Sequence, residues 1–389
     1  MNRETKEQRT EYDRGIGNYL IATVLLAVVI ALPLLTLGRM ALKHIPVSEY
    51  RENILGKYKM ITLNTALSEK ISGGGYMESN EVLLGKEGWL FYKVTTYGTP
   101  LYDYMGINRF TDDELARVYG NLSEVSEAVY SHRAKLRAEK GRPLFLPERD
   151  AVENSVSLAV LTIPNKEQVY SKYMPDTVEK IKDTSRLTQL SGYIVNRGHE
   201  IITMDRYVPK WTYTDVSDEF KKLSDEYPLY YKTDTHWTDV GAYLALTKVM
   251  NAVNAAQSAG MVTGYTGQFD DEAQADILEG VIFHEESGFV GDLTKISATQ
   301  DRFRDVTYKI DGNTIPDEYK TNKKLLIVGD SFGDSMQHVA KYCFAEVRFL
   351  DIKEYNDKFE DTLDTYDPDL VILECVERYL PRLTELENQ

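Results

Sequence analysis

Cysteine is almost absent from this chain, and its scarcity excludes several kinds of site. Only Cys343 and Cys375 occur among the 389 residues, and no Cys-x-x-Cys pair or Cys/His group has the spacing of metal ligands. We therefore expect no metal site and no cofactor. A disulfide between the two cysteines would require a location outside the cell, and two buried free thiols are the favoured interpretation.

Basic residues are also too few for a nucleic-acid-binding protein. Lysine and arginine number 45 against 61 aspartates and glutamates, which gives a formal net charge of −16. Recognition of phosphate backbones needs clustered positive charge, so this function is excluded. Tryptophan is scarce (3), whereas tyrosine is abundant (27). A tyrosine-rich surface suits contacts with sugars, although packing at the rim of the core explains the same composition.

One long apolar run without charged residues lies near the N-terminus, at residues 19–37. As a helix it would be about 28 Å long, close to the hydrocarbon thickness of a bilayer. The run is too long for an ordinary signal-peptide core, and no Ala-x-Ala-like cleavage site follows it. We predict an uncleaved signal anchor that forms one transmembrane helix, with a buried core helix as the alternative.

The basic residues around this run predict its orientation. Arg3, Lys6, Arg9 and Arg14 precede it, and only Arg39 and Lys43 follow it closely. By the positive-inside rule this favours a cytoplasmic N-terminus. The predicted parts are a cytoplasmic segment at 1–18, the anchor at 19–37, a juxtamembrane stalk at 38–80 and an extracytoplasmic domain at 81–389, held at the cytoplasmic membrane.

Strands and helices alternate along the rest of the chain. The predicted strands are 156–163, 200–204, 325–328, 346–350 and 369–373. The predicted helices are 111–140, which opens on a capping box, 176–192, 238–258 and 331–342. This alternation, with apolar β-branched runs, is typical of an α/β domain with a largely parallel sheet. Residues 260–323, rich in glycine, aspartate and threonine, predict a loop-rich insertion.

The most informative motif is Gly-Asp-Ser-Phe-Gly at residues 329–333, between a predicted strand and a predicted helix. A strand, a tight glycine turn and a helix expose a serine hydroxyl. They also leave N–H groups of the first helical turn able to bind an oxyanion. Ser331 is therefore a candidate nucleophile, and a serine at neutral pH needs a base. An ordinary glycine turn with a helix N-cap is the plainer alternative.

His236 stands apart from the other five histidines as the candidate base. It lies in Asp234-Thr235-His236-Trp237, and in an extended segment Asp234 and His236 would project from the same face. Asp234 could then orient the imidazole and leave the second ring nitrogen to accept the Ser331 proton. Trp237 could form a wall of the site. For Asp-x-His alone, a surface ion pair or half of a metal site is the alternative.

The order of these residues along the chain narrows the fold. Asp234 and His236 precede Ser331, whereas an α/β-hydrolase runs serine, acid, histidine. The commonest SGNH hydrolases place Gly-Asp-Ser first and the Asp/His pair near the C-terminus. We therefore predict a permuted SGNH-hydrolase-like domain of three layers with a mostly parallel sheet.

Four segments across about residues 84–380 carry a resemblance to a known family. They are Gly85-Lys86-Glu87-Gly88-Trp89-Leu90-Phe91, Ile163-Pro164-Asn165-Lys166 through Tyr170 and Pro175, Lys232-Thr233-Asp234-Thr235-His236-Trp237-Thr238, and Val328-Gly329-Asp330-Ser331-Phe332. In this order they resemble the alginate O-acetyltransferase AlgX/AlgJ-like family (DHHW-type, SGNH hydrolase-like). The third and fourth segments are the more specific.

The resemblance implies an activity and a partner. Ser331 would be the nucleophile, His236 the general base and Asp234 its orienting acid, in an O-acetyltransferase that modifies a secreted or cell-surface polysaccharide. Members of the family work with a multispanning membrane acyltransferase of the MBOAT type, which would supply the acetyl group here. The chain departs from the family in its predicted anchor and in having no recognisable C-terminal carbohydrate-binding module, so the acceptor polymer is undefined.

Three further residues are candidates for binding substrate. The oxyanion hole would combine the Ser331 amide with a second donor, either Asn165 or a glycine amide such as that of Gly291. Arg378 follows the last predicted strand, at the sheet edge where α/β proteins usually build their sites. A strand-end salt bridge is the alternative role for Arg378.

Two other functions stay open at this point. A polysaccharide deacetylase or esterase uses the same triad and differs in letting water reach the acyl-enzyme. A membrane-tethered polysaccharide-binding or assembly protein would carry the triad unused, and the intact set of Asp234, His236 and Ser331 argues against it. No motif decides between transfer and hydrolysis.

Overall fold

The computed structural model describes residues 30–31, 33–44, 81–95, 98–139, 158–203, 211–258 and 277–387. The chain divides into two units, Met1–Gly73 and Gly74–Gln389. In the first unit, the described residues from 30 to 42 are helical. Within the described ranges no helix combines the length and the apolar character that a membrane crossing requires. Most of the predicted anchor lies outside these ranges, so the anchor, the N-terminal segment and the stalk stay predictions.

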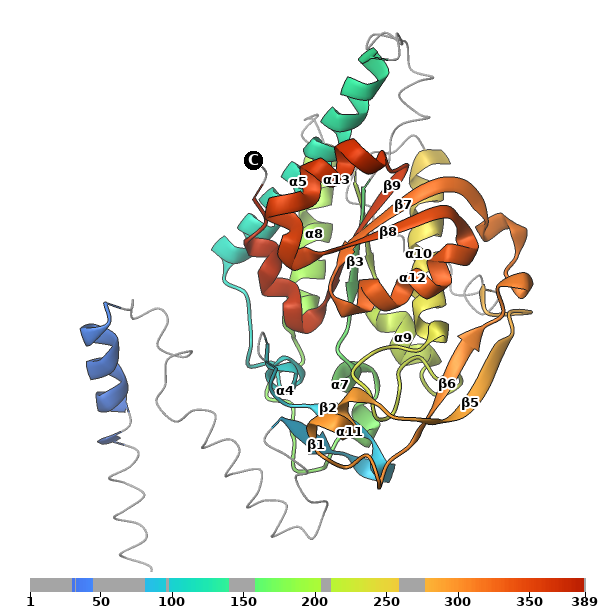
Figure 1. The fold of residues 1–389 in the computed structure, drawn as a ribbon. Helices are drawn as coiled ribbons and strands as arrows, with labels where there is room; N and C mark the ends of the chain where they lie inside the picture. Colours follow the sequence, from blue (N-terminus) through green and yellow to red (C-terminus); the bar gives the residue numbers. More distant parts are fainter. Residues whose placement is uncertain are drawn as a thin grey trace, which may run out of the picture. The chain divides into compact units, whose positions relative to one another are not determined.

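The second unit is built on a five-stranded sheet in the order β4-β3-β9-β7-β8 (Figure 1). Its strands are β3 (Leu158–Ile163), β4 (Trp211–Asp215), β7 (Thr321–Gly329), β8 (Phe344–Asp351) and β9 (Leu370–Val376). Every pairing in this sheet is parallel, which confirms the predicted α/β domain with a mostly parallel sheet. The inner strand β9 is buried along its whole length, because helices cover both faces of the sheet.

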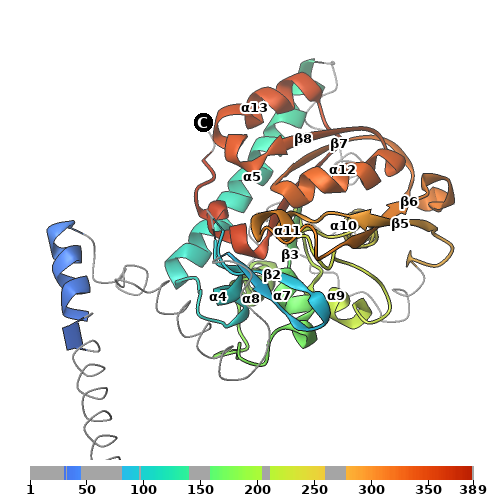
Figure 2. The same cartoon turned by 60° about the horizontal axis from the view of Figure 1, so that its bottom comes forward.

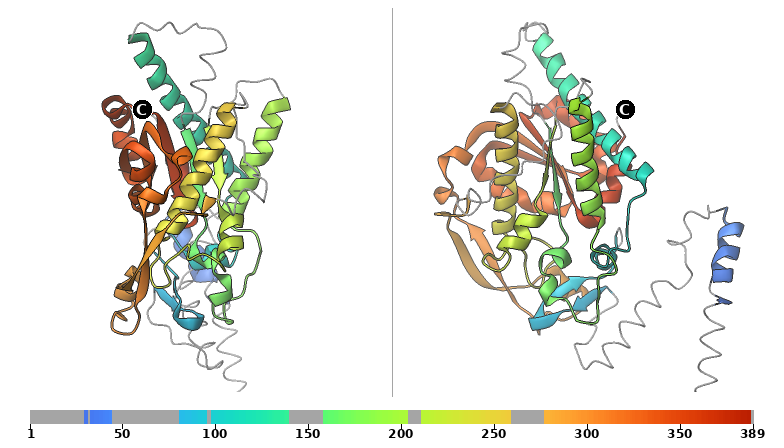
Figure 3. Two further views of the ribbon diagram at one scale, coloured as in Figure 1. Left: turned by 90° about the vertical axis from the view of Figure 1, so that its right-hand side faces the viewer. Right: turned by 180° about the vertical axis from the view of Figure 1, so that it is seen from behind.

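A layer of helices packs on each face of the sheet. One layer contains α10 (Asp239–Ser258) and α12 (Ser331–Cys343), and the other α5 (Asp112–Glu139), α8 (Arg186–Thr203) and α13 (Tyr355–Tyr366). Ile327 and Ile372 belong to the first core, whereas their strand neighbours Val328 and Leu373 belong to the second. Side chains that alternate along the strands therefore feed two apolar cores. In the view from behind, α10 and α8 lie on either side of β3 (Figure 3).

Local chemistry explains several element boundaries that the sequence predicts. At the start of α5 the Thr111 hydroxyl accepts the Glu114 amide, and the Glu114 carboxylate accepts the Thr111 amide, which confirms the capping box. α10 begins directly after Thr238, whose hydroxyl accepts the Gly241 amide. Both cysteines are buried free thiols, the arrangement that the sequence favours.

The structure differs from prediction between residues 176 and 215. Residues 176–185 form turns and bends, so the helix expected from 176 begins at Arg186 and continues to Thr203. The strand predicted at 200–204 is wrong, because residues 200–203 belong to this helix. Leu187, Leu190 and Ile194 are buried at helical spacing, which favours α8 over the strand suggested by the β-branched pair after Glu200. The strand of this region is β4.

The region expected to be a loop-rich insertion contains regular elements. Residues 260–276 lie outside the described residues. Beyond them, β5 (Phe283–Phe289) pairs antiparallel with β6 (Asp305–Ile310), and α11 (Asp292–Ile296) lies between the two in sequence. β5 is exposed along most of its length, so its sequence lacks the alternation of a half-buried strand.

Short elements gather at the carboxyl edge of the main sheet. They are the hairpin of β1 (Val82–Leu84) and β2 (Leu90–Tyr92), α4 (Pro100–Tyr104), α7 (Lys166–Val169), α9 (Ser217–Leu223) and the 3₁₀ helix η9 (Glu377–Thr384), together with α11. Figure 2 turns this edge forward and shows β2, α4, α7 and α11 there. The carboxyl edge of a parallel sheet is where α/β proteins build their sites.

The packing of β9 gives a test of the fold. Ile372 is fully buried, so Ile372→Ala should lower the free energy of unfolding by about 2–5 kcal/mol, because a cavity replaces the side chain. Lys323→Ala, at an exposed position of β7, should change it by about 0.5 kcal/mol or less. Denaturant unfolding of the purified chain measures both values. Similar small effects of the two substitutions would contradict the central place of β9.

Candidate active site

The segment that carries Asp234 and His236 is a closed loop. An antiparallel bridge joins Tyr230 to Trp237, and the Tyr231 amide donates to the His236 carbonyl. The residues between the bridge partners bend, so the extended segment assumed from the sequence is wrong. Asp234 and His236 nevertheless meet, because the Asp234 carboxylate accepts the backbone N–H of His236 at 3.0 Å in an Asx-type turn.

Three side chains form a continuous row of hydrogen bonds. His236 Nδ1 lies 2.7 Å from Asp234 Oδ1, and His236 Nε2 lies 2.8 Å from Ser331 Oγ. With the Nδ1 proton donated to the carboxylate, Nε2 is left to accept the serine proton. Asp234 is buried, His236 is partly exposed and Ser331 is exposed. The row therefore leads from the interior to a hydroxyl that solutes can reach.

The Asp234 carboxylate is held in its charged form. Burial raises its pKa, but hydrogen bonds from His236, the charge of the protonated imidazole and the Asp292 amide outweigh burial and lower the pKa from 3.8 to about 2. The Asp292 amide donates to Oδ2 at 2.7 Å. Because both carboxylate oxygens accept hydrogen bonds, the orientation of the His236 ring is fixed.

Ser331 occupies the first turn of α12, directly after β7 ends at Gly329. Asp330 is the N-cap of this helix, and its Oδ1 accepts the Phe332 amide at 2.9 Å. Its Oδ2 accepts the Val376 amide, also at 2.9 Å, from the neighbouring strand β9. The turn is thereby tied to the sheet on both sides of Ser331.

The fully buried carboxyl group of Glu374 lies under the same turn. Its Oε2 accepts the amides of Asp330 (3.2 Å) and Gly333 (2.8 Å). Burial, and then the charge of Asp330, raise the pKa of Glu374 well above its ordinary value. A β-carbon on Gly329 would collide with Glu374 Oε2, and one on Gly333 would lie 2.9 Å from it. Neither glycine has a positive φ, so the motif needs glycine for this close approach.

The backbone N–H of Ser331 is available to bind an oxyanion. In the first turn of α12 the Phe332 and Gly333 amides are engaged by Asp330 and Glu374. The Ser331 amide, in contrast, has no acceptor among the described residues. An amide at a helix N-terminus beside an exposed hydroxyl is a favourable place for developing negative charge.

Trp237 and Gly291 support the loop. The Trp237 ring packs against Phe332 with centroids 5.3 Å apart, and its indole N–H donates to the Ser335 hydroxyl at 2.6 Å. Trp237 is thus buried against α12, and its role as a wall of the site stays a prediction. A β-carbon on Gly291 would collide with the Thr233 carbonyl, so this glycine allows α11 to pack closely against the loop.

Asn165 and Arg378 meet in a buried network beside the site. Arg378 Nη1 lies 3.5 Å from Asn165 Oδ1, and the guanidinium lies 5.1 Å from the centroid of the Phe332 ring. Asn165 Nδ2 donates to Asp103 at 3.2 Å, and its backbone N–H donates to Glu377 at 3.1 Å. Asn165 is fully buried, so this geometry does not favour the oxyanion role considered for it.

Asp292 is a residue of the site that sequence reasoning missed. It begins α11, and its Oδ1 and Oδ2 accept the amide and the hydroxyl of Thr235 at 2.8 and 2.5 Å. Its Oδ2 lies 3.8 Å from His236 Nδ1. The sequence makes the neighbouring Gly291 a candidate, but no local pattern predicts that Asp292 contacts a loop more than fifty residues earlier in the chain.

Asp234, His236 and Asp292 also have the spacing of a metal site, because one ligand atom from each lies within 4.8 Å of the others. All four carboxylate oxygens, however, accept hydrogen bonds from N–H or O–H groups of the protein. His236 Nδ1 is engaged by Asp234 as well. This donor pattern suits a hydrogen-bonded triad better than a cation, whose ligands must offer free lone pairs.

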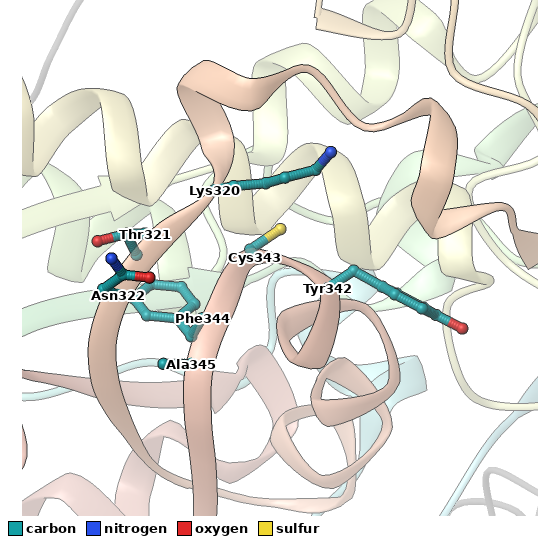
Figure 4. Close-up of a pocket in the computed structure, with 7 residues that line it drawn as sticks. All are labelled: Lys320, Thr321, Asn322, Tyr342, Cys343, Phe344 and Ala345. Carbon is teal, nitrogen blue, oxygen red and sulfur yellow. The ribbon is translucent and has the colours of Figure 1, made fainter.

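A hollow of about 210 Å³ lies elsewhere on the domain. Its lining includes Lys320, Asn322 and Tyr342 (Figure 4). These residues lie at the amino end of β7 and the carboxyl end of α12. Because β7 has nine residues, the hollow and Ser331 are separated by about 26 Å of strand. It is therefore not part of the site around the triad.

A parallel α/β sheet with a serine–histidine–aspartate row at its carboxyl edge agrees with the predicted SGNH hydrolase-like domain. The sequence matches the family described as "SGNH hydrolase-like domain, acetyltransferase AlgX" over residues 125–344, more than half of the chain. The matched region includes Asp234, His236 and Ser331. The chain belongs to this acetyltransferase family.

Solved structures are similar to the chain at low identity. The O-acetyltransferase domain of Pseudomonas putida AlgJ is 17% identical, covers 79% of this chain and 93% of its own, and has a TM-score of 0.39. Bacillus cereus PatB1 is 13% identical, covers 77% of this chain and 96% of its own, and has a TM-score of 0.42. A DHHW family protein from Eubacterium siraeum is 15% identical, covers 79% of this chain and 99% of its own, and has a TM-score of 0.45. No curated protein matches the chain. Membership of the family rests on the sequence match.

The contact between Gly329 and Glu374 predicts a sharp effect of a small substitution. Gly329→Ala should lower the free energy of unfolding by about 1–3 kcal/mol through overpacking. It should also slow the labelling of Ser331 by phenylmethanesulfonyl fluoride by about tenfold or more, because the displaced carboxyl group of Glu374 no longer holds the turn. Gly120→Ala is the control, since a β-carbon there meets nothing within 4 Å. It should stabilise α5 by about 1 kcal/mol or less. Equal labelling rates in both variants would argue against the role of Glu374.

The lowered pKa of Asp234 predicts a dependence of stability on acid. Its contribution is present above the ordinary pKa of 3.8 and is lost as pH falls through about 2. The loss amounts to about 2 kcal/mol. Between about pH 5 and about pH 1, wild type should therefore lose about 2 kcal/mol more unfolding free energy than Asp234→Asn. Denaturant titrations at each pH measure this difference, and identical acid profiles would contradict the charged, hydrogen-bonded state of Asp234.

Proposed function

We propose that this chain is a membrane-anchored, serine-dependent O-acetyltransferase acting on hydroxyl groups of a secreted or cell-surface polysaccharide. The observation that carries this function is the row from Asp234 through His236 to the exposed Ser331, with contacts of 2.7 and 2.8 Å. Such a row activates a serine, and the matched family supplies acetyl as the transferred group.

In the first half-reaction Ser331 takes the acetyl group from a donor ester. Its Oγ bonds to the carbonyl carbon while its proton moves to His236 Nε2. The bond between that carbon and the leaving oxygen then breaks, and the imidazolium returns the proton to the leaving group. Asp234 stabilises the imidazolium between these steps. The products are acetyl-Ser331 and the alcohol of the donor.

In the second half-reaction a sugar hydroxyl attacks the acetyl-enzyme. His236 Nε2 accepts the proton of that hydroxyl as its oxygen bonds to the carbonyl carbon. The bond to Ser331 Oγ then breaks, and Oγ recovers the proton from His236. In both half-reactions the Ser331 amide, at the N-terminus of α12, would donate to the oxyanion of the tetrahedral intermediate.

The choice of acceptor and location rests on further features. Ser331 is exposed, so a polymer chain could approach it. The predicted anchor at 19–37 would hold the domain outside the cytoplasmic membrane, where such polymers lie. There an MBOAT-type membrane acyltransferase, implied by the resemblance, would be the acetyl supplier. Hydrolysis by water is the competing fate of the same acyl-enzyme.

One experiment separates transfer, hydrolysis and an unused triad. The purified chain in detergent is incubated with an activated aryl acetate, with and without oligosaccharides. We expect acetylated oligosaccharide, and Ser331→Ala should lower its formation by about 10³-fold or more. Ser123→Ala, a serine on α5 that donates to the Tyr119 carbonyl, should behave as wild type.

Two results would overturn this function. Free acetate as the sole product with every acceptor tested would favour an esterase. Equal yields of acetate and acetylated sugar from wild type and Ser331→Ala would reject the serine mechanism and favour a binding or assembly protein.

A further inference from the structure

A buried ammonium group lies under the loop that carries Asp234 and His236. Lys166 Nζ donates to three carbonyl oxygens of this loop, those of Asp234 (2.7 Å), Tyr231 (3.2 Å) and Lys232 (3.4 Å). An ammonium has three N–H donors and no acceptor, so the loop takes its full donor capacity. Lys166 is only 3% exposed, which rules out a direct contact with a polymeric substrate.

The base of this side chain is fixed by its neighbours. Lys166 begins α7, directly beyond the carboxyl end of β3. On one side, the Asn165 amide donates to Glu377. On the other, the Glu167 carboxylate accepts the Tyr92 amide at 2.9 Å. The ammonium therefore projects from a point that is anchored to the hairpin β1–β2 and to η9.

The hairpin β1–β2 packs against the same ammonium and the same loop. Nζ lies 5.8 Å from the centroid of the Trp89 ring and 5.4 Å from that of Phe91. Aromatic faces at these distances attract a cation. Between these rings, the Leu90 amide donates to the Lys232 carbonyl at 3.0 Å. The sequence segments at 85–91 and 163–166, which have no part in the triad, thus converge on the loop.

The loop is held from two sides by groups of opposite charge. Carboxylates engage its N–H groups, since Asp305 accepts the Thr233 amide at 2.6 Å and Asp292 accepts the Thr235 amide at 2.8 Å. Lys166 engages its carbonyls. Loss of the ammonium would take its N–H donors from the buried carbonyl oxygens of Tyr231 and Asp234, which is costly. The Lys232 carbonyl would keep the Leu90 amide, but the peptide planes on either side of Asp234 could then rotate.

The charge of Lys166 is balanced by its surroundings. Burial lowers the pKa of Lys166 to about 8, against the attraction of nearby carboxylates. Four carboxylates face the ammonium: Glu167 on α7, Asp292 on α11, Asp234 in the loop and Asp305 on β6. At neutral pH the side chain is therefore an ammonium that can use all three donors.

We propose that Lys166 is a positioning residue for the reaction of Ser331. Its three hydrogen bonds set the loop against α12 and thereby the 2.8 Å contact between His236 Nε2 and Ser331 Oγ. This role rests on the proposed function, because it assumes that Ser331 is the nucleophile. Lys166 touches neither substrate nor the reacting atoms.

The test measures how fast Ser331 reacts with phenylmethanesulfonyl fluoride in the full chain. In this reaction Ser331 Oγ bonds to sulfur, fluoride leaves and His236 takes the proton, so no acetyl donor or sugar is involved. We expect Lys166→Met to slow labelling by about 10- to 100-fold, because a small misplacement of a base has effects of this size. The fold is checked by circular dichroism and thermal unfolding.

Lys248→Met is the matched control. Lys248 is equally buried, at 3% exposure, and pairs with Glu219 between α10 and α9. Lys248→Met should lower thermal stability as much as Lys166→Met does. It should leave the labelling rate of Ser331 within about twofold of wild type, since distant sites act independently. If both variants lose labelling in proportion to their stability, Lys166 is merely structural and the inference fails.

Two further variants keep the test decisive if Lys166→Met does not fold. Lys166→Gln retains a donor group and should react faster than Lys166→Met but slower than wild type. Lys166→Arg keeps the charge but cannot direct its planar fork at three carbonyls, so it should also react slowly. With an aryl acetate, each folded variant should lose kcat at unchanged KM. Wild-type labelling by any folded Lys166 variant would overturn the inference.

The labelling assay also separates this inference from the proposed function. If wild type is labelled at Ser331 and the Lys166 variants are labelled as fast, only the role of Lys166 falls. If wild type is not labelled at Ser331, or Ser331→Ala is labelled equally, the serine mechanism falls and the role of Lys166 falls with it.

Discussion

The hydrogen bond between His236 Nε2 and Ser331 Oγ is the contact on which the proposed activity depends, and the surrounding elements hold its two sides in place. It joins two segments 95 residues apart, a bent loop and the first turn of the helix α12. On one side the first turn of α12 is held by the carboxyl groups of Asp330 and Glu374. On the other, a closed loop is held between α7, α11 and β6. A 2.8 Å contact between two such segments requires that each be fixed independently.

The supports on both sides are buried charged or ionisable groups, which are expensive to remove from water. Glu374 and Lys166 meet this cost differently. The pKa of Glu374 is raised, which favours its neutral form, and its Oε2 accepts two amides. Lys166 has its three donors on three carbonyls. Each holds backbone groups rather than side chains, so each acts on the position of the chain itself. Burying these groups lowers the stability of the domain but fixes the positions of the reacting side chains.

The sequence could predict the elements whose signals are local. The capping box at Thr111, the strand before Ser331 and the Asp-x-His pair each lie within a few residues, and all are present. The bounds of α8 were predicted wrongly, and the strand β4 was not predicted. Ile201 and Ile202 suggest a strand when the helical spacing of more distant residues is ignored. Glu374, Asp292 and Lys166 could not be assigned roles, since their partners lie 41 to 68 residues away. The residues next to an isolated acidic residue or lysine do not indicate whether its side chain is buried.

The central claim is that Ser331 carries the acetyl group between donor and acceptor. Its most direct test is to mix the purified chain briefly with an activated acetyl ester, stop the reaction with acid and map peptides by mass spectrometry. We expect one acetyl group, ester-linked to Ser331, that disappears when an acceptor oligosaccharide is added before the acid. Turnover by wild type with no acetyl group on Ser331 at any time point, or with the acetyl group on another residue, would contradict it.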